Sequence, residues 1–415
     1  MTSTAPARPA RILIVDDSAV MRSLLRSVIS VDKRLEVAGT ASDGASALRA
    51  MDSLTPDLVL LDVEMPVMDG LSTLKEMKNK ARKVPVIMCS SLTQRGAKVT
   101  IEALASGAAD YVTKPSGAPS REAAVQTLAH DLVPKILALT AHSTHPTVHA
   151  TASPGIFSPA LSSLFTPPHG SSPSSSSGSA LPQGRPQYGY ASSILPPAAA
   201  PAIISTPAVL LIGVSTGGPA ALDLLLPALP ASFPLPVLIV QHMPELFTKM
   251  LAERLDTRCA MRVAEAVHGQ AIRPGNIYIA KGNWHMEVTG TYFEGNGFGP
   301  PPMLRLTQDP LENHCRPAVD VLFRTAVAVY GSRILGVILT GMGSDGLAGS
   351  RLIREHRGTI LAQDAATSAV WGMPGAVSQA GLAQRILPLP AIAPEILRIV
   401  SRTQREAIEL RESAV

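Results

Sequence analysis

Three residue types that together can hydrolyse an ester occur in the second half of the chain, each shortly after an apolar run. They are Ser215, His242 and Asp345. A free serine hydroxyl is too weak an acid to attack a carbonyl unaided, so it needs a histidine as general base and a carboxylate to orient that histidine. This set therefore indicates acyl transfer to water.

The residues around Ser215 favour the same chemistry. Glycines at 217 and 218 would let backbone N–H groups approach an oxyanion, and the start of a following helix adds partial positive charge. Residues 213–217 also match the Gly-x-Ser-x-Gly nucleophile elbow, although a glycine-rich turn between strand and helix fits this short pattern too. The order serine, histidine, aspartate differs from the order in α/β-hydrolases, so we reject that fold.

The remaining histidines are weaker candidates for the general base. His268 and His356 stand alone in loop or helix contexts. His285 and His314 are harder to dismiss, and lining a substrate cleft or a structural role fits either of them equally well. A thiol pair of Cys315 with His314 is disfavoured, because neighbours in sequence rarely face each other.

Five polar residues lie at the carboxyl ends of the first, third, fourth and fifth predicted strands in the first half of the chain: Asp16, Asp17, Asp62, Ser90 and Lys114. Each alone would be explained as a cap, a turn residue or a solvent-exposed group. Strand ends in a doubly wound sheet converge on one crevice, where three carboxylates repel unless a hard cation such as Mg²⁺ neutralises them. Asp62 would then be a nucleophile for a phosphoryl group, with Lys114 and the metal stabilising its charge.

Short apolar runs alternate with helical patterns in both halves, which predicts parallel sheets covered on both faces. In the first half we expect strands at 12–15, 35–38, 58–61, 84–89 and 111–112. In the second half we expect strands at 209–214, 236–241, 276–280, 334–340 and 359–363, and helices at 246–255, 317–330, 347–354 and 394–410.

The 415 residues are enough for two or three domains. From about residue 139 to residue 206 the sequence is dominated by Ser, Pro, Ala, Gly and Thr, which bury too little apolar surface to offset the entropy of ordering. We therefore expect a first domain at 1–138, a linker at 139–206 and a second domain at 207–415.

Charge and cysteine content disfavour several classes of protein. The net charge is only +4 and no block of Lys and Arg suggests a nucleic-acid-binding surface. Cys89, Cys259 and Cys315 are too scattered for a disulfide framework or a zinc site, which favours the cytoplasm. No apolar signal segment follows Met1, and prolines interrupt the apolar stretch 195–214, so we expect no membrane insertion.

The acidic group in the first half resembles that of two-component response-regulator receivers. The residues that carry this resemblance are Asp16-Asp17, Asp62-Val63-Glu64-Met65-Pro66, Asp69-Gly70, Ser90 and Lys114-Pro115, within residues 11 to about 130. The resemblance implies a flavodoxin-like domain with a five-stranded parallel sheet. It also implies phosphorylation of Asp62 by a histidine kinase, with Asp17, Asp62 and the Glu64 carbonyl around Mg²⁺, and a cis Lys114–Pro115 bond.

The second half resembles the chemotaxis protein-glutamate methylesterases. The match covers roughly residues 208–390, through Ser215-Thr216-Gly217-Gly218-Pro219, Gln241-His242-Met243-Pro244, Arg316-Pro317-Ala318-Val319-Asp320-Val321-Leu322-Phe323, Leu339-Thr340-Gly341-Met342-Gly343-Ser344-Asp345-Gly346, Ala362-Gln363-Asp364, Ala366-Thr367-Ser368 and Gly372-Met373-Pro374. It implies a doubly wound, mostly parallel α/β hydrolytic domain that releases methanol from methyl-glutamate on chemoreceptors and deamidates receptor glutamines. Ser215 would be the nucleophile, His242 the base and Asp345 the orienting group. Thr216 and Met342 would lie beside them, near the oxyanion.

Together the resemblances imply a cytoplasmic, monomeric enzyme of chemotaxis adaptation whose partners are a histidine kinase and methylated chemoreceptors. No nucleic acid, and no cofactor for the esterase, is expected. The alternatives are a response regulator with a non-chemotaxis receptor target, one with a DNA-binding output, and a non-catalytic scaffold. The chain offers no basic recognition helix, and all three candidate catalytic residues are present. The long linker and the extended segment Gly290–Pro302 depart from the family pattern, which leaves domain docking and receptor choice open.

Overall fold

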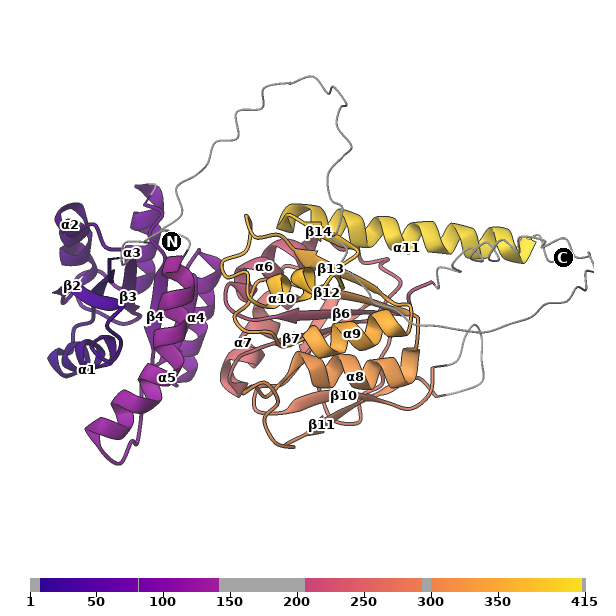
Figure 1. The fold of residues 1–415 in the computed structure, drawn as a ribbon, viewed down its shortest axis with the longest axis horizontal. Coiled ribbons are helices and arrows are strands. Elements are labelled where there is room, and N and C mark those ends of the chain that lie inside the picture. Colours follow the sequence, from indigo (N-terminus) through magenta and orange to yellow (C-terminus); the bar gives the residue numbers. More distant parts are fainter. Residues whose placement is uncertain (1–7, 81, 142–205, 293–299, 413–415) are drawn as a thin grey trace, which may run out of the picture. The chain divides into compact units, whose positions relative to one another are not determined.

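The computed structural model describes residues 8–80, 82–141, 206–292 and 300–412, with no account of side chains from residue 403 onward (Figure 1). Nearly all of the predicted linker at 139–206, and much of the Gly290–Pro302 extension, lie outside these residues. The limits expected for the three segments of the chain stay predictions.

The N-terminal domain has a five-stranded sheet in the order β2-β1-β3-β4-β5, with every neighbouring pair parallel. Its elements are β1 (Ala10–Val15), α1 (Ala19–Ile29), β2 (Leu35–Ala41), α2 (Gly44–Leu54), β3 (Leu58–Asp62), α3 (Gly70–Asn79), β4 (Val86–Ser90), α4 (Gln94–Ala105), β5 (Asp110–Thr113) and α5 (Arg121–Thr140). This arrangement confirms the flavodoxin-like fold that the sequence predicted.

Both faces of this sheet are buried, because successive side chains of the central strands point to opposite faces and pack against helices on each. Ile12 and Ile14 pack with residues of α1 and α5, whereas Leu13 and Val15 pack with residues of α2, α3 and α4. The residue just before each helix caps it, because its side chain accepts a hydrogen bond from a backbone N–H of the first turn; these residues are Ser18, Asp43, Asp69, Thr93 and Ser120. These caps fix where each loop at the carboxyl edge gives way to a helix.

The C-terminal domain is built on a seven-stranded parallel sheet in the order β14-β13-β12-β6-β7-β9-β8, with a separate antiparallel pair β10-β11. The elements are β6 (Val209–Val214), α6 (Gly218–Leu225), β7 (Val237–Gln241), α7 (Glu245–Asp256), β8 (Arg262–Glu265), β9 (Asn276–Ile279), β10 (His285–Thr289), β11 (Met303–Thr307), α8 (Val319–Tyr330), β12 (Ile334–Ile338), α9 (Leu347–Glu355), β13 (Thr359–Gln363), α10 (Met373–Gln379), β14 (Arg385–Leu387) and α11 (Leu389–Glu412).

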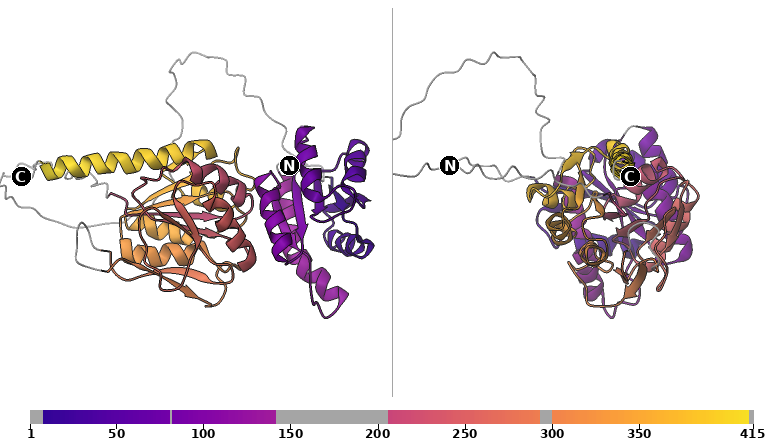
Figure 2. Two further views of the ribbon diagram at one scale, coloured as in Figure 1. Left: turned by 180° about the vertical axis from the view of Figure 1, so that it is seen from behind. Right: turned by 90° about the vertical axis from the view of Figure 1, so that its right-hand side faces the viewer.

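Helices cover both faces of the larger sheet. Apolar side chains of α6, α7 and α11 pack on one face, and those of α8, α9, α10 and the β10-β11 pair pack on the other. Figure 1 shows these helices around the strands of the sheet. The long helix α11 extends past the end of the sheet (Figure 2). This domain is therefore doubly wound, as the sequence predicted.

Some expectations were incomplete or wrong. The short strands β8 and β14 and the β10-β11 pair were not predicted, and α8 begins at Val319, two residues after the predicted start. The cis bond among the described residues is Arg316–Pro317, so the expected cis Lys114–Pro115 bond was wrong; proline permits either isomer. Within the described ranges, every helix is too short or too polar to cross a membrane.

Candidate active site

The strand order reverses beside β6, which places the predicted catalytic residues at one edge of the sheet. Strand β6 lies between β7 and β12, and the chain continues from these three neighbours into Ser215, His242 and Asp345 respectively. The carboxyl ends of parallel strands meet at this edge, and such a reversal point is where ligands bind in open α/β sheets.

Asp345 is almost fully buried, with a side chain 3 % exposed, and five donors hold its carboxylate. Oδ2 accepts from His242 Nε2 at 2.8 Å and Val319 N at 2.6 Å; Oδ1 accepts from Asp320 N at 3.0 Å, Gly346 N at 3.0 Å and Asn313 Nδ2 at 2.8 Å. Two of these donors are the first N–H groups of α8, a helix with no side-chain cap of its own. The Asp345 carboxylate therefore takes the place of a cap at a helix N-terminus, where negative charge is favoured.

Hydrogen bonds set the charge state of the histidine–aspartate pair. Burial opposes ionisation of Asp345, but His242 and the N–H groups of α8 outweigh it and hold the pKa of Asp345 below its usual value. Burial also works to lower the pKa of His242, yet hydrogen bonds to Asp345 and to the Cys315 thiol raise it to about 9. Asp345 is consequently a carboxylate, and His242 must lose a proton before it can act as a base.

Nε2 of His242 is hydrogen-bonded to Asp345, so Nδ1 is the nitrogen that can accept a proton from a nucleophile. In the described structure Cys315 Sγ lies 3.6 Å from His242 Nδ1. Within the described residues, no hydrogen bond joins the Ser215 hydroxyl to this histidine. Ser215, Thr216, His242, Cys315 and Met342 nevertheless line the same cavity, so the structure brings all five side chains to one site.

The backbone around Ser215 is held by close packing. Ser215 N donates to Thr340 O at 3.0 Å, and Gln241 Nε2 donates to Ser215 O at 3.0 Å. Gly217 has a φ of 78°, which favours glycine, and a Cβ at Gly341 would lie 2.8 Å from the Ser215 Cβ. These glycines let two strand ends approach closely beside the serine.

The hydroxyl of Thr216, the residue after Ser215, forms a hydrogen bond with the N-terminal domain. Thr216 is 4 % exposed, and its Oγ1 donates to Asp110 Oδ2 at 2.6 Å. Gly217 N also donates to Ala109 O at 3.1 Å. Both domains belong to one compact unit. Burial raises the pKa of Asp110, although Lys135 and the hydrogen bond from Thr216 act to lower it.

The predicted acidic pocket is assembled in the N-terminal domain. Carboxylate oxygens of Asp16, Asp17 and Asp62 lie within 4.8 Å of one another, and Lys114 Nζ lies 2.9 Å from Asp16 Oδ2 and 2.7 Å from Asp62 Oδ1. Burial, with the Asp16 charge, raises the pKa of Asp62 despite the Lys114 ammonium. Ser90 Oγ accepts from Thr100 Oγ1 at 2.7 Å. Three hard oxygen donors in this arrangement fit Mg²⁺.

One contact, the ion pair of the Glu64 side chain, was not anticipated, whereas a structural role or a place in the cleft was left open for His285 and His314. Glu64 pairs through its side chain with Arg95 at 3.3 Å, so a role at a metal would fall to its backbone carbonyl. His285 is buried, with Nε2 3.0 Å from Pro310 O and Nδ1 accepting from Ala318 N, which supports a structural role. His314 lines the cavity that contains Ser215.

Asn313 and Cys315 were also missed as partners of Asp345 and His242. The only sequence signal was their position in the segment just before Arg316-Pro317, between the histidine and the aspartate in chain order. Nothing in that position reveals that the segment folds back onto the His242–Asp345 pair.

Both domains are similar to domains of known proteins. Residues 12–126 match the response regulator receiver domain, and residues 210–396 match the CheB methylesterase family. A protein-glutamate methylesterase/protein-glutamine glutaminase of a Nocardioides species is 45 % identical over 398 residues, 94 % of this chain and 96 % of the relative. One from Trichodesmium erythraeum is 42 % identical over 388 residues, 94 % of this chain and 98 % of the relative.

A solved structure is also similar to part of the chain. The crystal structure of the Thermotoga maritima CheB methylesterase catalytic domain is 39 % identical and covers 47 % of this chain and 100 % of that chain, with a TM-score of 0.44. From the matches over nearly its full length, the chain belongs to the family of protein-glutamate methylesterases/protein-glutamine glutaminases, carboxylic ester hydrolases, here with a response-regulator receiver domain in the same chain.

Proposed function

We propose that this enzyme hydrolyses glutamate methyl esters on chemoreceptors in the cytoplasm, with Ser215 as nucleophile, His242 as general base and Asp345 as orienting group. The observation that carries the proposal is the buried His242–Asp345 hydrogen bond beside Ser215, with the carboxylate fixed by four further donors. A histidine oriented in this way is what activation of a serine requires. The same site would deamidate receptor glutamines.

In the first half of the reaction, Ser215 Oγ attacks the ester carbonyl carbon while His242 Nδ1 takes the hydroxyl proton. The oxyanion forms near Thr216 and Met342, and Met342 is 36 % exposed at the cavity wall. The C–O bond to methanol then breaks, and the histidine returns its proton to the leaving oxygen. Water, activated by the same histidine, hydrolyses the acyl-enzyme to glutamate. With a glutamine substrate, ammonia leaves instead.

A test of this proposal is peptide mass spectrometry of a methylated chemoreceptor fragment after incubation with the purified protein. We expect methyl-glutamate and glutamine at the methylation sites to become glutamate. Unchanged peptides, under conditions in which the protein is folded, would argue against the proposal.

We also propose that phosphorylation of Asp62 by a histidine kinase regulates the esterase. Asp17, Asp62 and the Glu64 carbonyl would hold Mg²⁺, which when bound neutralises the crowded carboxylates and the phosphoryl group. Lys114 lies within ion-pair distance of Asp62, and Thr100 fixes Ser90 nearby. The Thr216–Asp110 hydrogen bond supports an effect on the esterase, because it ties the residue beside the nucleophile to the receiver. A shift in the receiver that breaks this bond would free the site.

A small phosphodonor with Mg²⁺ is therefore expected to raise the esterase activity of the wild type by roughly tenfold, as a coupling of about 1–2 kcal/mol gives. Asp62→Asn should neither accept phosphoryl label nor respond. Asp52→Asn is a matched control, since Asp52 is an exposed carboxylate of the same domain. Undiminished labelling of Asp62→Asn would reject Asp62 as the acceptor.

The pH dependence of kcat/KM provides a test of the histidine. Because only neutral His242 can accept the serine proton, we expect kcat/KM to rise with pH and to level off above a pKa of about 9. Cys315 raises that pKa, so Cys315→Ala should move the inflection to lower pH. A steady-state profile with no change through the neutral and alkaline range, or an inflection that moves upward in Cys315→Ala, would contradict this assignment.

A further inference from the structure

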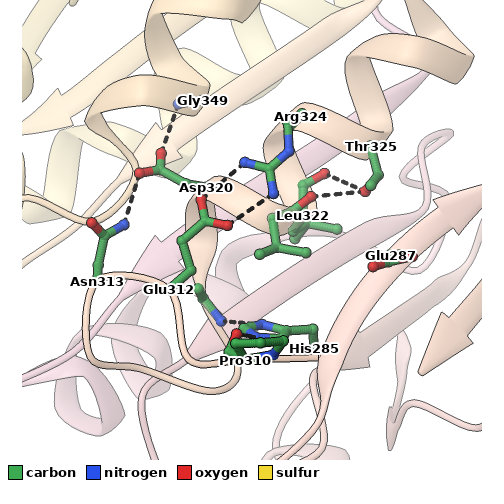
Figure 3. Close-up of polar contacts among 12 residues, drawn as sticks. His285, Glu287, Pro310, Glu312, Asn313, Asp320, Leu322, Arg324, Thr325 and Gly349 are labelled. Carbon is green, nitrogen blue, oxygen red and sulfur yellow. Dashed lines mark hydrogen bonds and ion pairs between the residues drawn. The ribbon is translucent and has the colours of Figure 1, made fainter. Parts of the chain in front are cut away.

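The amide of Asn313 bridges two buried carboxylates. Its Nδ2 donates to Asp345 Oδ1 at 2.8 Å and to Asp320 Oδ2 at 2.9 Å, which uses both hydrogens of the nitrogen. The other oxygen of Asp320 accepts from Gly349 N at 2.6 Å (Figure 3). Asp345 and Asp320 are 3 % and 4 % exposed, so neither charge is well solvated. A donor shared between them relieves the repulsion of two like charges.

The backbone around Asn313 is arranged to deliver this amide. Asn313 and His314 have φ values of 53° and 63°, a left-handed conformation that asparagine tolerates better than most residues. Glu312 and Cys315 exchange backbone hydrogen bonds of 3.1 Å and 2.9 Å, which closes the turn.

Charged and aromatic partners on neighbouring elements anchor this turn (Figure 3). Glu312 forms a two-pronged ion pair with Arg324 of α8 at 2.9 Å. Upstream, Pro310 O lies 3.0 Å from Nε2 of the buried His285. The amide is therefore held by a turn that is itself fixed to α8 and β10.

We propose that Asn313 is a positioning residue of the esterase, an inference that rests on the proposed function. Asp345 presents Oδ2 to His242 and Oδ1 to Asn313, so the amide, together with Asp320 N and Gly346 N on the same oxygen, limits rotation of the carboxylate about its Cβ–Cγ bond. Without the amide, no shared donor offsets the repulsion between the Asp345 and Asp320 carboxylates. The Asp345 side chain can then shift, and the alignment of its Oδ2 with His242 Nε2 becomes less precise. Asn313 thus acts on catalysis through Asp345 and the histidine.

The variant Asn313→Ala removes the amide donor from both carboxylates. We expect kcat to fall about 10- to 100-fold, the loss typical of one hydrogen bond to a charged group, with KM nearly unchanged. The inflection of kcat/KM against pH should also move below that of the wild type, because a loosened Asp345 stabilises protonated His242 less well. A residue with only a structural role would not move this inflection.

The variant Asn313→Asp separates the electrostatic role from the backbone role. Aspartate accepts the left-handed conformation better than alanine does, but it adds a third carboxylate and, when ionised, offers no donor. Residue 313 contacts the carboxylates Asp320 and Asp345. The neighbouring charged and titratable groups are Glu312 with its Arg324 partner, His242, which is bonded to Asp345, and His285, which acts on Glu312. At neutral pH we therefore expect Asn313→Asp to be less active than Asn313→Ala.

The control is Asn276→Ala, since Asn276 Nδ2 also donates to two oxygens, of Arg273 and Pro274, away from the site. Wild-type protein and the three variants would be compared with the methylated receptor fragment over a pH series. Wild-type kcat and inflection in Asn313→Ala, or an Asn313→Asp variant more active than Asn313→Ala, would overturn the inference. A wild-type protein that hydrolyses no methyl ester would instead overturn the proposed function.

Discussion

Replacing Ser215 with alanine should reduce ester hydrolysis by about 10⁶ in turnover, the typical loss when the nucleophile of such a triad is removed. The reason is chemical: without Oγ no acyl-enzyme forms, and His242 has no proton to accept from the serine. The side chain is small and partly exposed, and the backbone contacts with Thr340 and Gln241 do not depend on Oγ, so the fold should persist.

Steady-state kinetics on the methylated receptor fragment would measure this loss, with thermal denaturation to confirm folding. Ser378→Ala is a suitable control because the Ser378 hydroxyl donates only to Pro374 O within α10, away from the cavity. Activity of Ser215→Ala within an order of magnitude of the wild type would reject Ser215 as the nucleophile.

Replacing Asp345 with asparagine should lower kcat by about 10⁴, as the loss of an orienting carboxylate does in comparable triads. Asp345 accepts five hydrogen bonds, and an amide has one oxygen in place of two. The NH₂ group would have to face either His242 or the N–H groups that now bind the carboxylate. In the first case the NH₂ group donates to His242 Nε2 and stabilises the tautomer with a proton on Nδ1, which cannot act as a base. In the second case the NH₂ group faces buried N–H donors, which then lose their acceptor.

The matched control is Asp256→Asn, because Asp256 Oδ1 accepts a hydrogen bond from Val263 N away from the cavity that Ser215 and His242 line. Single-turnover kinetics would separate the chemical step from binding, and the loss should appear in the chemical step. An Asp345→Asn enzyme with near wild-type kcat would contradict the orienting role.

The sequence was sufficient to predict the two sheets and the residues at their carboxyl edges. Buried parallel strands give continuous apolar runs, and the residue after each run must lie at the same edge. This rule brought together Ser215, His242 and Asp345, and likewise Asp62 and Lys114. The three-residue β14 and the four-residue β8 escaped it, because they are too short for a recognisable pattern.

Contacts that depend on loop conformation could not be predicted in the same way. The amide of Asn313 reaches Asp345 through two left-handed residues, a conformation that its local sequence does not dictate. The Thr216–Asp110 hydrogen bond joins residues 106 positions apart in different domains. Such contacts follow from tertiary packing, which the periodicity of a sequence does not encode.

The most direct test of the account is the release of methanol from a chemoreceptor fragment labelled in its methyl esters. The purified wild-type protein should release volatile label, with one glutamate carboxylate formed for each methanol, and Ser215→Ala and His242→Ala should release almost none. No volatile label from the wild type, or equal release from Ser215→Ala, would contradict the claim that Ser215 hydrolyses glutamate methyl esters.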